Sequence, residues 1–133
     1  IEVSNMYEQI LAIVKFDDRG LVPVVVQDTV GTVLMLAYVN EEALLKTLQT
    51  GVMHYYSRSR QRLWIKGETS GNTQTLQELR VDCDGDALLC IVEQKGAACH
   101  EGYYTCFFRR VSGESPVTIA RRLFDPAQVY KDA

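Results

Sequence analysis

Apolar residues with helical spacing predict two helices in the first half of the chain. The first covers Asn5 to Val14 and is expected to end at the polar stretch Asp17–Gly20. The second begins after Asn40, whose side chain suits an N-cap and is followed by two glutamates, and it ends at Gly51. Both predicted helices carry an apolar stripe that must be buried against another element.

A third helix is expected near the C-terminus. Ser115 is a suitable N-cap, and Pro116 would occupy the first helical position. The buried face of this helix would consist of Ile119, Ala120, Leu123 and Phe124. We expect the residues after Asp125 to form a tail.

Between the helices, runs of β-branched and apolar residues separated by turn residues predict strands. The expected strands cover residues 21–27, 32–39, 52–58, 62–66, 75–81, 87–92 and 103–109. The first two would form a hairpin at the centre of the sheet, and the third and fourth would form another. The pattern predicts an α+β fold, rich in β-structure, with two or three helices packed on one side of a mainly antiparallel sheet.

Length and composition are those of an ordinary globular domain. The chain has 133 residues, of which 47% are hydrophobic and 23% charged, so residues 1–133 are expected to fold as one unit. A formal net charge of −3 argues against a general nucleic-acid binder, which would carry a basic excess. No apolar run approaches the roughly 20 residues of a membrane helix. We therefore expect a cytoplasmic protein that acts on a small molecule.

One segment, Val81–Phe108, concentrates residues that bind metals. It contains all four cysteines and one of the two histidines. A reducing cytosol disfavours disulfides, which remain the alternative, and favours metal binding by clustered thiols. Cys83, Cys99 and Cys106 are three soft ligands without an obvious fourth, which is typical of zinc with an open position for water. Cys90 lies within an apolar run and is expected to be a core residue.

Three carboxylates alternate with other residues in this segment, namely Asp82, Asp84 and Asp86. In an extended backbone they would project to one side and Cys83 to the other. Converging carboxylates repel each other unless a cation lies among them, and oxygen ligands suit Mg²⁺ or Mn²⁺. The alternatives are a solvated acidic turn and an EF-hand loop, although the sixth position of such a loop requires glycine and is Ala87 here.

Basic and aromatic residues crowd into the second predicted hairpin and the glycine-flanked loop 67–72 that follows it. Cationic side chains and loop N–H groups would bind phosphate, and an aromatic side chain would stack on a base. Taken singly, these side chains are equally explained by surface solubility. The candidate substrate-binding residues are Arg58, Arg60, Trp64, Lys66, Glu68 and Ser70. His100 directly follows Cys99 and is the candidate for proton transfer.

Six segments between residues 16 and 110 carry a more specific signal. They read VVVQD, VLMLAYVNEEAL, YSRSR, LWIKGETSG, DCDGDALL and ACHEGYYTCF. Together, and above all through DCDGD followed by CH and CF, they resemble the phosphoribosyl-AMP cyclohydrolase family of histidine biosynthesis.

The resemblance implies a monofunctional enzyme that hydrolyses the N1–C6 bond of the adenine ring in 1-(5-phosphoribosyl)-AMP. It also implies an intertwined homodimer with one zinc ion per subunit, held by the three cysteines named above and contributed by both chains. The three aspartates would hold magnesium. On this basis we expect zinc to lower the pKa of the water that attacks C6, and His100 to move protons as the ring opens.

Two other classes of function are compatible with parts of the sequence. One is a non-catalytic nucleotide-binding or nucleic-acid-binding module in which a fully coordinated zinc ion stabilises a small fold. The other is a zinc nucleobase deaminase, but the H-x-E and P-C-x-x-C motifs of those enzymes are missing.

Overall fold

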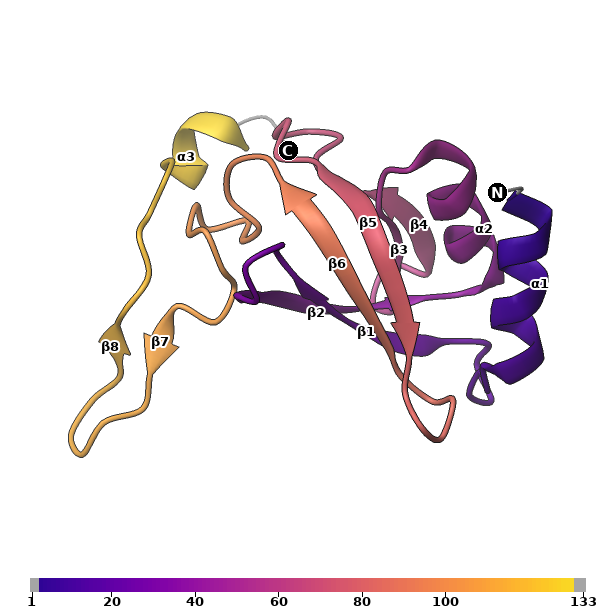
Figure 1. Cartoon of the computed structure of the whole chain (residues 1–133). Coiled ribbons are helices and arrows are strands. Elements are labelled where there is room, and N and C mark those ends of the chain that lie inside the picture. Colours follow the sequence, from indigo (N-terminus) through magenta and orange to yellow (C-terminus); the bar gives the residue numbers. More distant parts are fainter. Residues whose placement is uncertain (1–2, 131–133) are drawn as a thin grey trace.

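A four-stranded sheet lies at the centre of the fold (Figure 1). The structure is a computed structural model that describes residues 3–130. Its helices are α1 (Val3–Ile13), α2 (Glu41–Thr50) and α3 (Pro126–Val129). Its strands are β1 (Val22–Gln27), β2 (Val33–Val39), β3 (His54–Ser57), β4 (Arg62–Ile65), β5 (Gln74–Val81), β6 (Leu88–Gln94), β7 (Arg109–Arg110) and β8 (Val117–Thr118). Within residues 3–130, none of the helices combines the length and apolar character needed to cross a membrane.

The strand order of the main sheet is β2-β1-β6-β5. The pairs β1–β2 and β5–β6 are antiparallel, whereas β1 and β6 are parallel. The predicted α+β fold with a mainly antiparallel sheet is therefore confirmed. The prediction that the first hairpin lies at the sheet centre is only half right, because β6 pairs with β1 and leaves β2 at an edge. The hairpin β3–β4 forms a separate two-stranded sheet.

One face of the main sheet forms the hydrophobic core together with α1 and α2, which lie next to each other in Figure 1. Alternate residues of β1 and β6 point into this core, as the period of a strand requires. They are Val22, Val24, Val26, Leu88, Cys90 and Val92. Burial raises the pKa of the Cys90 thiol to about 12, so Cys90 is a neutral core residue, as predicted.

Both ends of α2 are fixed by the residues that the sequence indicated. The Asn40 side chain accepts a hydrogen bond of 2.8 Å from the Ala43 N–H group. At the other end, Gly51 adopts φ +79°, and its N–H group donates to the Thr47 carbonyl. The predicted boundaries of this helix are confirmed.

Residues 103–109 do not form the strand that their apolar character predicts. Only Arg109 and Arg110 enter a strand, β7, and Tyr103 forms a single bridge with Arg122. The backbone of this segment is bonded to several elements in turn, because Tyr104 N–H donates to the Arg121 carbonyl and Cys106 N–H donates to the Leu34 carbonyl. Partners in different directions are incompatible with one straight ladder.

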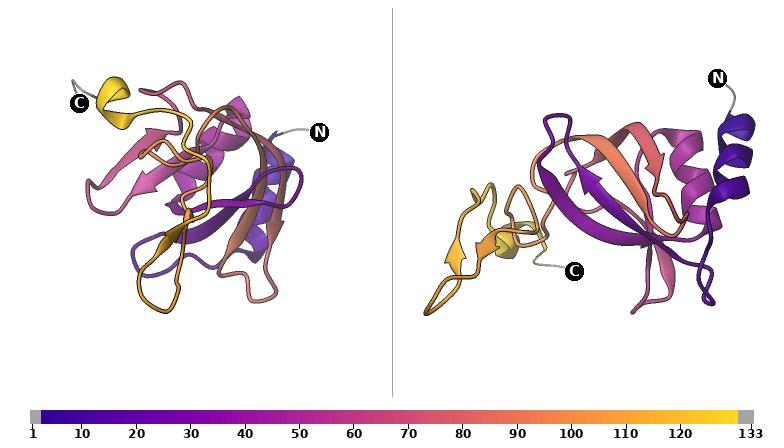
Figure 2. Two further views of the ribbon diagram at one scale, coloured as in Figure 1. Left: turned by 90° about the vertical axis from the view of Figure 1, so that its left-hand side faces the viewer. Right: turned by 60° about the horizontal axis from the view of Figure 1, so that its bottom comes forward.

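The predicted third helix is also wrong. Its sequence forms the short strand β8 and extended backbone, and its apolar residues Ile119 and Leu123 are 55% and 42% exposed. A helix needs a surface on which to bury its apolar face, and this part of the chain lies away from the core (Figures 1 and 2). We call residues 107–125 the arm. In place of an unstructured tail, the short helix α3 follows the arm, with Asp125 as its N-cap.

Candidate functional site

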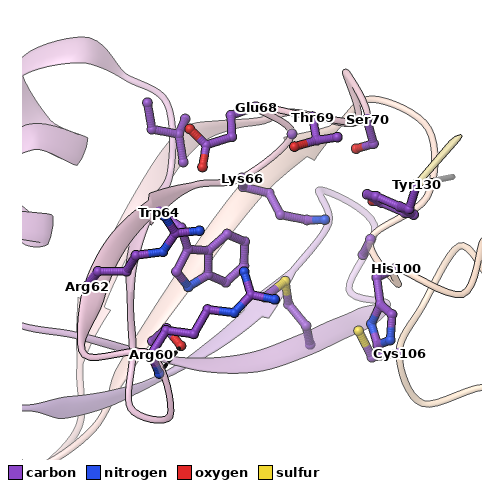
Figure 3. Close-up of a pocket in the computed structure, with 15 residues that line it drawn as sticks. Arg60, Arg62, Trp64, Lys66, Glu68, Thr69, Ser70, His100, Cys106 and Tyr130 are labelled. Carbon is purple, nitrogen blue, oxygen red and sulfur yellow. Dashed lines mark hydrogen bonds between the residues drawn. The ribbon is translucent and has the colours of Figure 1, made fainter. Parts of the chain in front are cut away.

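A pocket of about 400 Å³ lies between the β3–β4 hairpin and the segment that follows β6 (Figure 3). Three groups of residues line it. Ser57, Arg60, Arg62, Trp64, Ile65 and Lys66 form the hairpin wall, residues 67–70 form the loop wall, and residues 98–106 contribute Ala98, His100 and Cys106 to what we call the thiol wall. Met35 and Tyr130 complete the lining.

The hairpin wall presents cations around an aromatic ring. Pairing of Tyr55 with Trp64 and of Ser57 with Arg62 sets the register, and the Trp64 ring packs against the buried Tyr55 ring at 5.0 Å. Arg62 and Trp64 are two residues apart on β4, so they share a face of the hairpin. In Figure 3 they lie across the pocket from His100 and Cys106.

Lys66 adds a third positive charge at the base of the hairpin wall. Its backbone N–H group donates to the Met53 carbonyl at 3.0 Å, and the residue is only 6% exposed. Burial lowers the pKa of the Lys66 amine, while the nearby Cys106 and Cys99 thiols act in the opposite direction. Within residues 3–130 this amine forms no ion pair, so it is available to an anionic ligand.

The loop wall is a tight turn that begins and ends at glycine. Gly67 has φ +88°, and a Cβ atom there would lie 2.7 Å from the Asn72 carbonyl carbon, so only glycine fits. Glu68 N–H donates to the Ile65 carbonyl at the end of β4, and Gly71 N–H donates to the Gly67 carbonyl across the turn. Among the described residues, the N–H groups of Thr69 and Ser70 have no hydrogen-bond partner. Both residues line the pocket.

The thiol wall brings two of the three candidate zinc ligands together. Cys99 N–H donates to the Tyr103 carbonyl, and Gly102 N–H donates back to the Cys99 carbonyl, which closes a turn around His100. The Cys99 and Cys106 side chains are neighbours. Although Cys106 is partly exposed, burial of its thiol and the neighbouring Cys99 raise its pKa to about 12. Two such thiols become good ligands when a cation stabilises their thiolates.

Cys83 is not part of this wall. It lies in the turn that precedes β6, whereas Cys99 and Cys106 lie beyond the other end of that strand. Seven residues of strand at about 3.3 Å each separate the two ends by roughly 20 Å. Accordingly, within residues 3–130 no group of three His, Cys, Asp or Glu side chains is arranged to hold a metal ion.

The aspartate cluster occupies the same turn as Cys83. The expectation of extended backbone there is wrong, because β5 ends at Val81 and residues 83–86 turn back into β6. Asp86 N–H donates to Asp82 Oδ1 at 3.0 Å. The side chains also share a hydrogen bond. This hydrogen bond with Asp82, together with the Asp82 charge, raises the pKa of Asp86. For Asp82, burial alone would raise the pKa, but hydrogen bonds from Asp86 and from the turn lower it.

The sequence identified most of the pocket residues but not all of them. Of the candidate substrate-binding residues, only Arg58 does not line the pocket, because its guanidinium stacks on the Tyr38 ring at 4.0 Å. Arg62 and Thr69 were missed, although Arg62 shares the strand period of Trp64. Tyr130 was also missed, and no local signal indicates it, since its position depends on the path of the whole arm.

Comparison with known proteins adds independent information. Residues 35–108 match the family model described as phosphoribosyl-AMP cyclohydrolase. The chain is 60% identical over 116 residues to the phosphoribosyl-AMP cyclohydrolase of Haloarcula marismortui, covering 86% of this chain and 94% of the relative. It is 61% identical over 101 residues to the protein of the same name from Archaeoglobus fulgidus, covering 75% and 94%. It is also 50% identical over 125 residues to the histidine biosynthesis bifunctional protein HisIE of Thermoanaerobacter pseudethanolicus, covering 93% of this chain and 58% of that protein.

Proposed function

Because this chain belongs to the phosphoribosyl-AMP cyclohydrolase family, we propose that it opens the adenine ring of 1-(5-phosphoribosyl)-AMP by zinc-dependent hydrolysis of the N1–C6 bond. The observation that carries the proposal is the pocket itself. It combines three cationic side chains and a half-buried indole on one side with an imidazole and the Cys106 thiol on the other, and the buried Cys99 lies next to Cys106. The cations and the indole suit a substrate with two phosphates and a purine. The imidazole and the thiol suit its hydrolysis.

The thiol wall suits zinc. Cys99 and Cys106 are neighbouring soft donors of the kind that zinc prefers. Zinc bound there would supply a Lewis acid that lowers the pKa of a bound water to about 7. Cys83 of the same chain is too far away to be the third ligand, so we propose that Cys83 of a second copy completes the site.

The residues of the pocket then have separate tasks. Arg60, Arg62 and Lys66 neutralise phosphate oxygens, assisted by the N–H groups of the loop wall. The Trp64 ring provides a flat apolar surface for the purine. His100, which is exposed at the pocket wall, transfers a proton to N1 as the N1–C6 bond breaks.

Magnesium at Asp82, Asp84 and Asp86 remains part of the proposal. A hydrogen bond with Asp82 and the charges of Asp82 and Asp84 raise the pKa of Asp86, so these two charges repel that of Asp86. A divalent cation would remove this repulsion, and carboxylate oxygens are its preferred ligands. Its place in the β5–β6 turn next to Cys83 would put it beside the zinc site of the second copy.

The homodimer is proposed from exposed apolar surface. Val33 and Leu36 of β2 are 43% and 50% exposed on the sheet face that does not cover the core. The arm adds Phe107, Ile119 and Leu123, which are also exposed. Apolar surface of this extent is characteristic of an interface. The four cysteines are all free thiols, which supports a reducing, cytoplasmic location.

Ring opening of phosphoribosyl-AMP, followed by ultraviolet absorbance, tests the proposal directly. We expect turnover by the wild-type protein, loss of turnover after chelation and recovery when zinc is restored. Cys99→Ser should lose both zinc content and turnover. Cys90→Ala, which removes a buried thiol outside the pocket, is the matched control and should keep both. Full zinc content and full turnover in Cys99→Ser would show the zinc assignment to be wrong.

A further inference from the structure

Asn72 lies between the loop wall and the thiol wall, outside the pocket lining. It is separated from the loop wall by Gly71 alone, and it is half-buried. On its other side lies the segment Gly96–Ala98, which leads into Cys99 and His100. Asn72 and Ala97 are 25 positions apart in the sequence, so the two walls come from distant parts of the chain.

The Asn72 side chain bonds to both walls at once. Its Oδ1 atom accepts a hydrogen bond of 3.1 Å from the N–H group of Ala97, which is almost completely buried. Its Nδ2 atom donates to the Ser70 carbonyl at 3.5 Å, and its backbone N–H group donates to Ser70 Oγ at 3.2 Å. One amide therefore connects Ser70 of the loop wall to the residue that precedes the thiol wall.

Two glycines allow this close approach. A Cβ atom on Gly96 would lie 1.9 Å from Asn72 Oδ1, and one on Gly67 would lie 2.7 Å from the Asn72 backbone. Both glycines have positive φ angles, which other residues adopt only with strain. Asn72 is thus held between Gly67 and Gly96, where neither neighbour has a side chain that could replace its contacts.

We propose that Asn72 is a positioning residue that sets the separation between the loop wall, which binds phosphate, and the thiol wall, which carries the reacting groups. This inference rests on the proposed function for the meaning of the two walls. The Asn72 side chain does not line the pocket and touches no reacting group. Its effect is exerted through the placement of Ser70 on one side and of Cys99 and His100 on the other.

Loss of the Asn72 amide should affect turnover more than substrate binding. Without the Asn72 amide, each wall keeps its own residues, so substrate phosphates still bind. The susceptible bond is then no longer held in register with His100, and a misplacement of about 1 Å costs on the order of 100-fold in rate. The loss should therefore fall on kcat rather than on KM.

The test compares three variants in the ring-opening assay. Asn72→Ala should lower kcat by about 10- to 100-fold and change KM less than about threefold. Asn72→Asp keeps an acceptor oxygen for the Ala97 N–H group but loses the Nδ2 donor to the Ser70 carbonyl, so its kcat should lie between those of wild type and Asn72→Ala. Thr73→Ala is the matched control. Thr73 is the next residue and is similarly half-buried, and within residues 3–130 its hydroxyl forms no hydrogen bond, so its kcat should equal that of wild type.

A second measurement does not depend on activity. Hydrogen exchange of the Ala97 amide should be roughly five- to tenfold faster in Asn72→Ala and unchanged in Asn72→Asp, because only the first loses the acceptor. Fluorescence of Trp64, the single tryptophan, should report AMP binding of wild-type affinity in both variants.

Each outcome decides one question. An inactive wild-type protein would refute the proposed function and leave the exchange experiment as the test of the Asn72 contact. An active wild type with unchanged kcat in Asn72→Ala would refute the positioning role. So would an Asn72→Asp protein as impaired as Asn72→Ala, or an equal loss in Thr73→Ala, because either result would indicate general disturbance of the loop.

Discussion

Asp28 connects two segments that are far apart in the sequence. Its carboxylate accepts hydrogen bonds from the N–H groups of Thr32 and Val30, which shape the β1–β2 turn, and from the Tyr104 hydroxyl at 2.7 Å. Burial alone would raise the pKa of Asp28, but these hydrogen bonds outweigh burial and lower it. The charged form of this carboxylate is therefore the one that stabilises the fold.

The sign of this shift predicts how stability depends on pH. A carboxyl group with a lowered pKa contributes stability above its unfolded pKa of about 3.9 and loses that contribution as pH falls through the folded value. Asp28→Asn should destabilise the protein by about 1–2 kcal/mol at pH 7, and the difference from wild type should shrink towards pH 3. Urea unfolding at both pH values measures it. Asp18→Asn, at an exposed position, is the control, and an Asp28→Asn effect independent of pH would contradict the prediction.

Lys66 should show opposite effects on stability and turnover. Its buried amine has a lowered pKa, because burial disfavours the charged form, so the protonated side chain opposes folding at pH 7. Lys66→Met should raise the free energy of unfolding by about 1 kcal/mol. The same change removes a cation from the pocket and should lower kcat/KM at least about tenfold.

The control for this prediction is Lys46→Met. Lys46 lies on the exposed surface of α2, where it pairs with Glu42 at 3.7 Å, and surface pairs of this kind contribute little. Both stability and turnover should stay near wild-type values in that variant. If Lys66→Met were as active as wild type, Lys66 would not contact the substrate.

At the scale of elements, capping residues predicted a helix correctly where the apolar face of that helix is buried. The helix α2 was predicted to its ends because Asn40 and Gly51 act through contacts with residues three or four positions away. The segment after Ser115 carried equally good helix signals, yet it forms β8 and extended backbone. Its apolar face has no surface to cover within residues 3–130, so capping residues alone could not stabilise a helix.

The N-cap of α2 gives a direct test of this reasoning. Asn40→Ala removes the acceptor of the Ala43 N–H group, and the orphan donor should cost about 1 kcal/mol of stability. Asn40→Asp keeps an acceptor and adds a favourable charge at the helix N-terminus, so it should be as stable as wild type. Thermal unfolding measures both. Equal stability in all three proteins would mean that packing alone fixes the start of α2.

At the scale of the whole molecule, the sequence supplied candidate ligands but could not arrange them. Spacing alone treated Cys83, Cys99 and Cys106 as one set, whereas the fold places Cys83 at the opposite end of β6 from the other two. The arrangement depends on strand pairing between distant segments, which ligand spacing does not encode. The proposed homodimer with a shared site would reunite the three thiols.

Mixing two inactive variants distinguishes a shared site from a site within one chain. In a twofold dimer, each site would take Cys83 from one subunit and Cys99 with Cys106 from the other. A Cys83→Ser subunit paired with a Cys99→Ser subunit has one site with both defects and one intact site. Random pairing gives mixed dimers in half of the population, so refolding the variants together should restore about a quarter of wild-type turnover and zinc content.

The control replaces the second partner by a protein that carries both substitutions. A Cys83→Ser subunit paired with this double variant has no intact site in any combination, so the mixture should remain inactive. Sedimentation of the mixtures verifies that subunits have exchanged. If Cys83→Ser and Cys99→Ser exchange freely and still show neither turnover nor zinc, the three thiols are not shared between chains. The zinc site would then require a rearrangement of the β5–β6 turn within one chain.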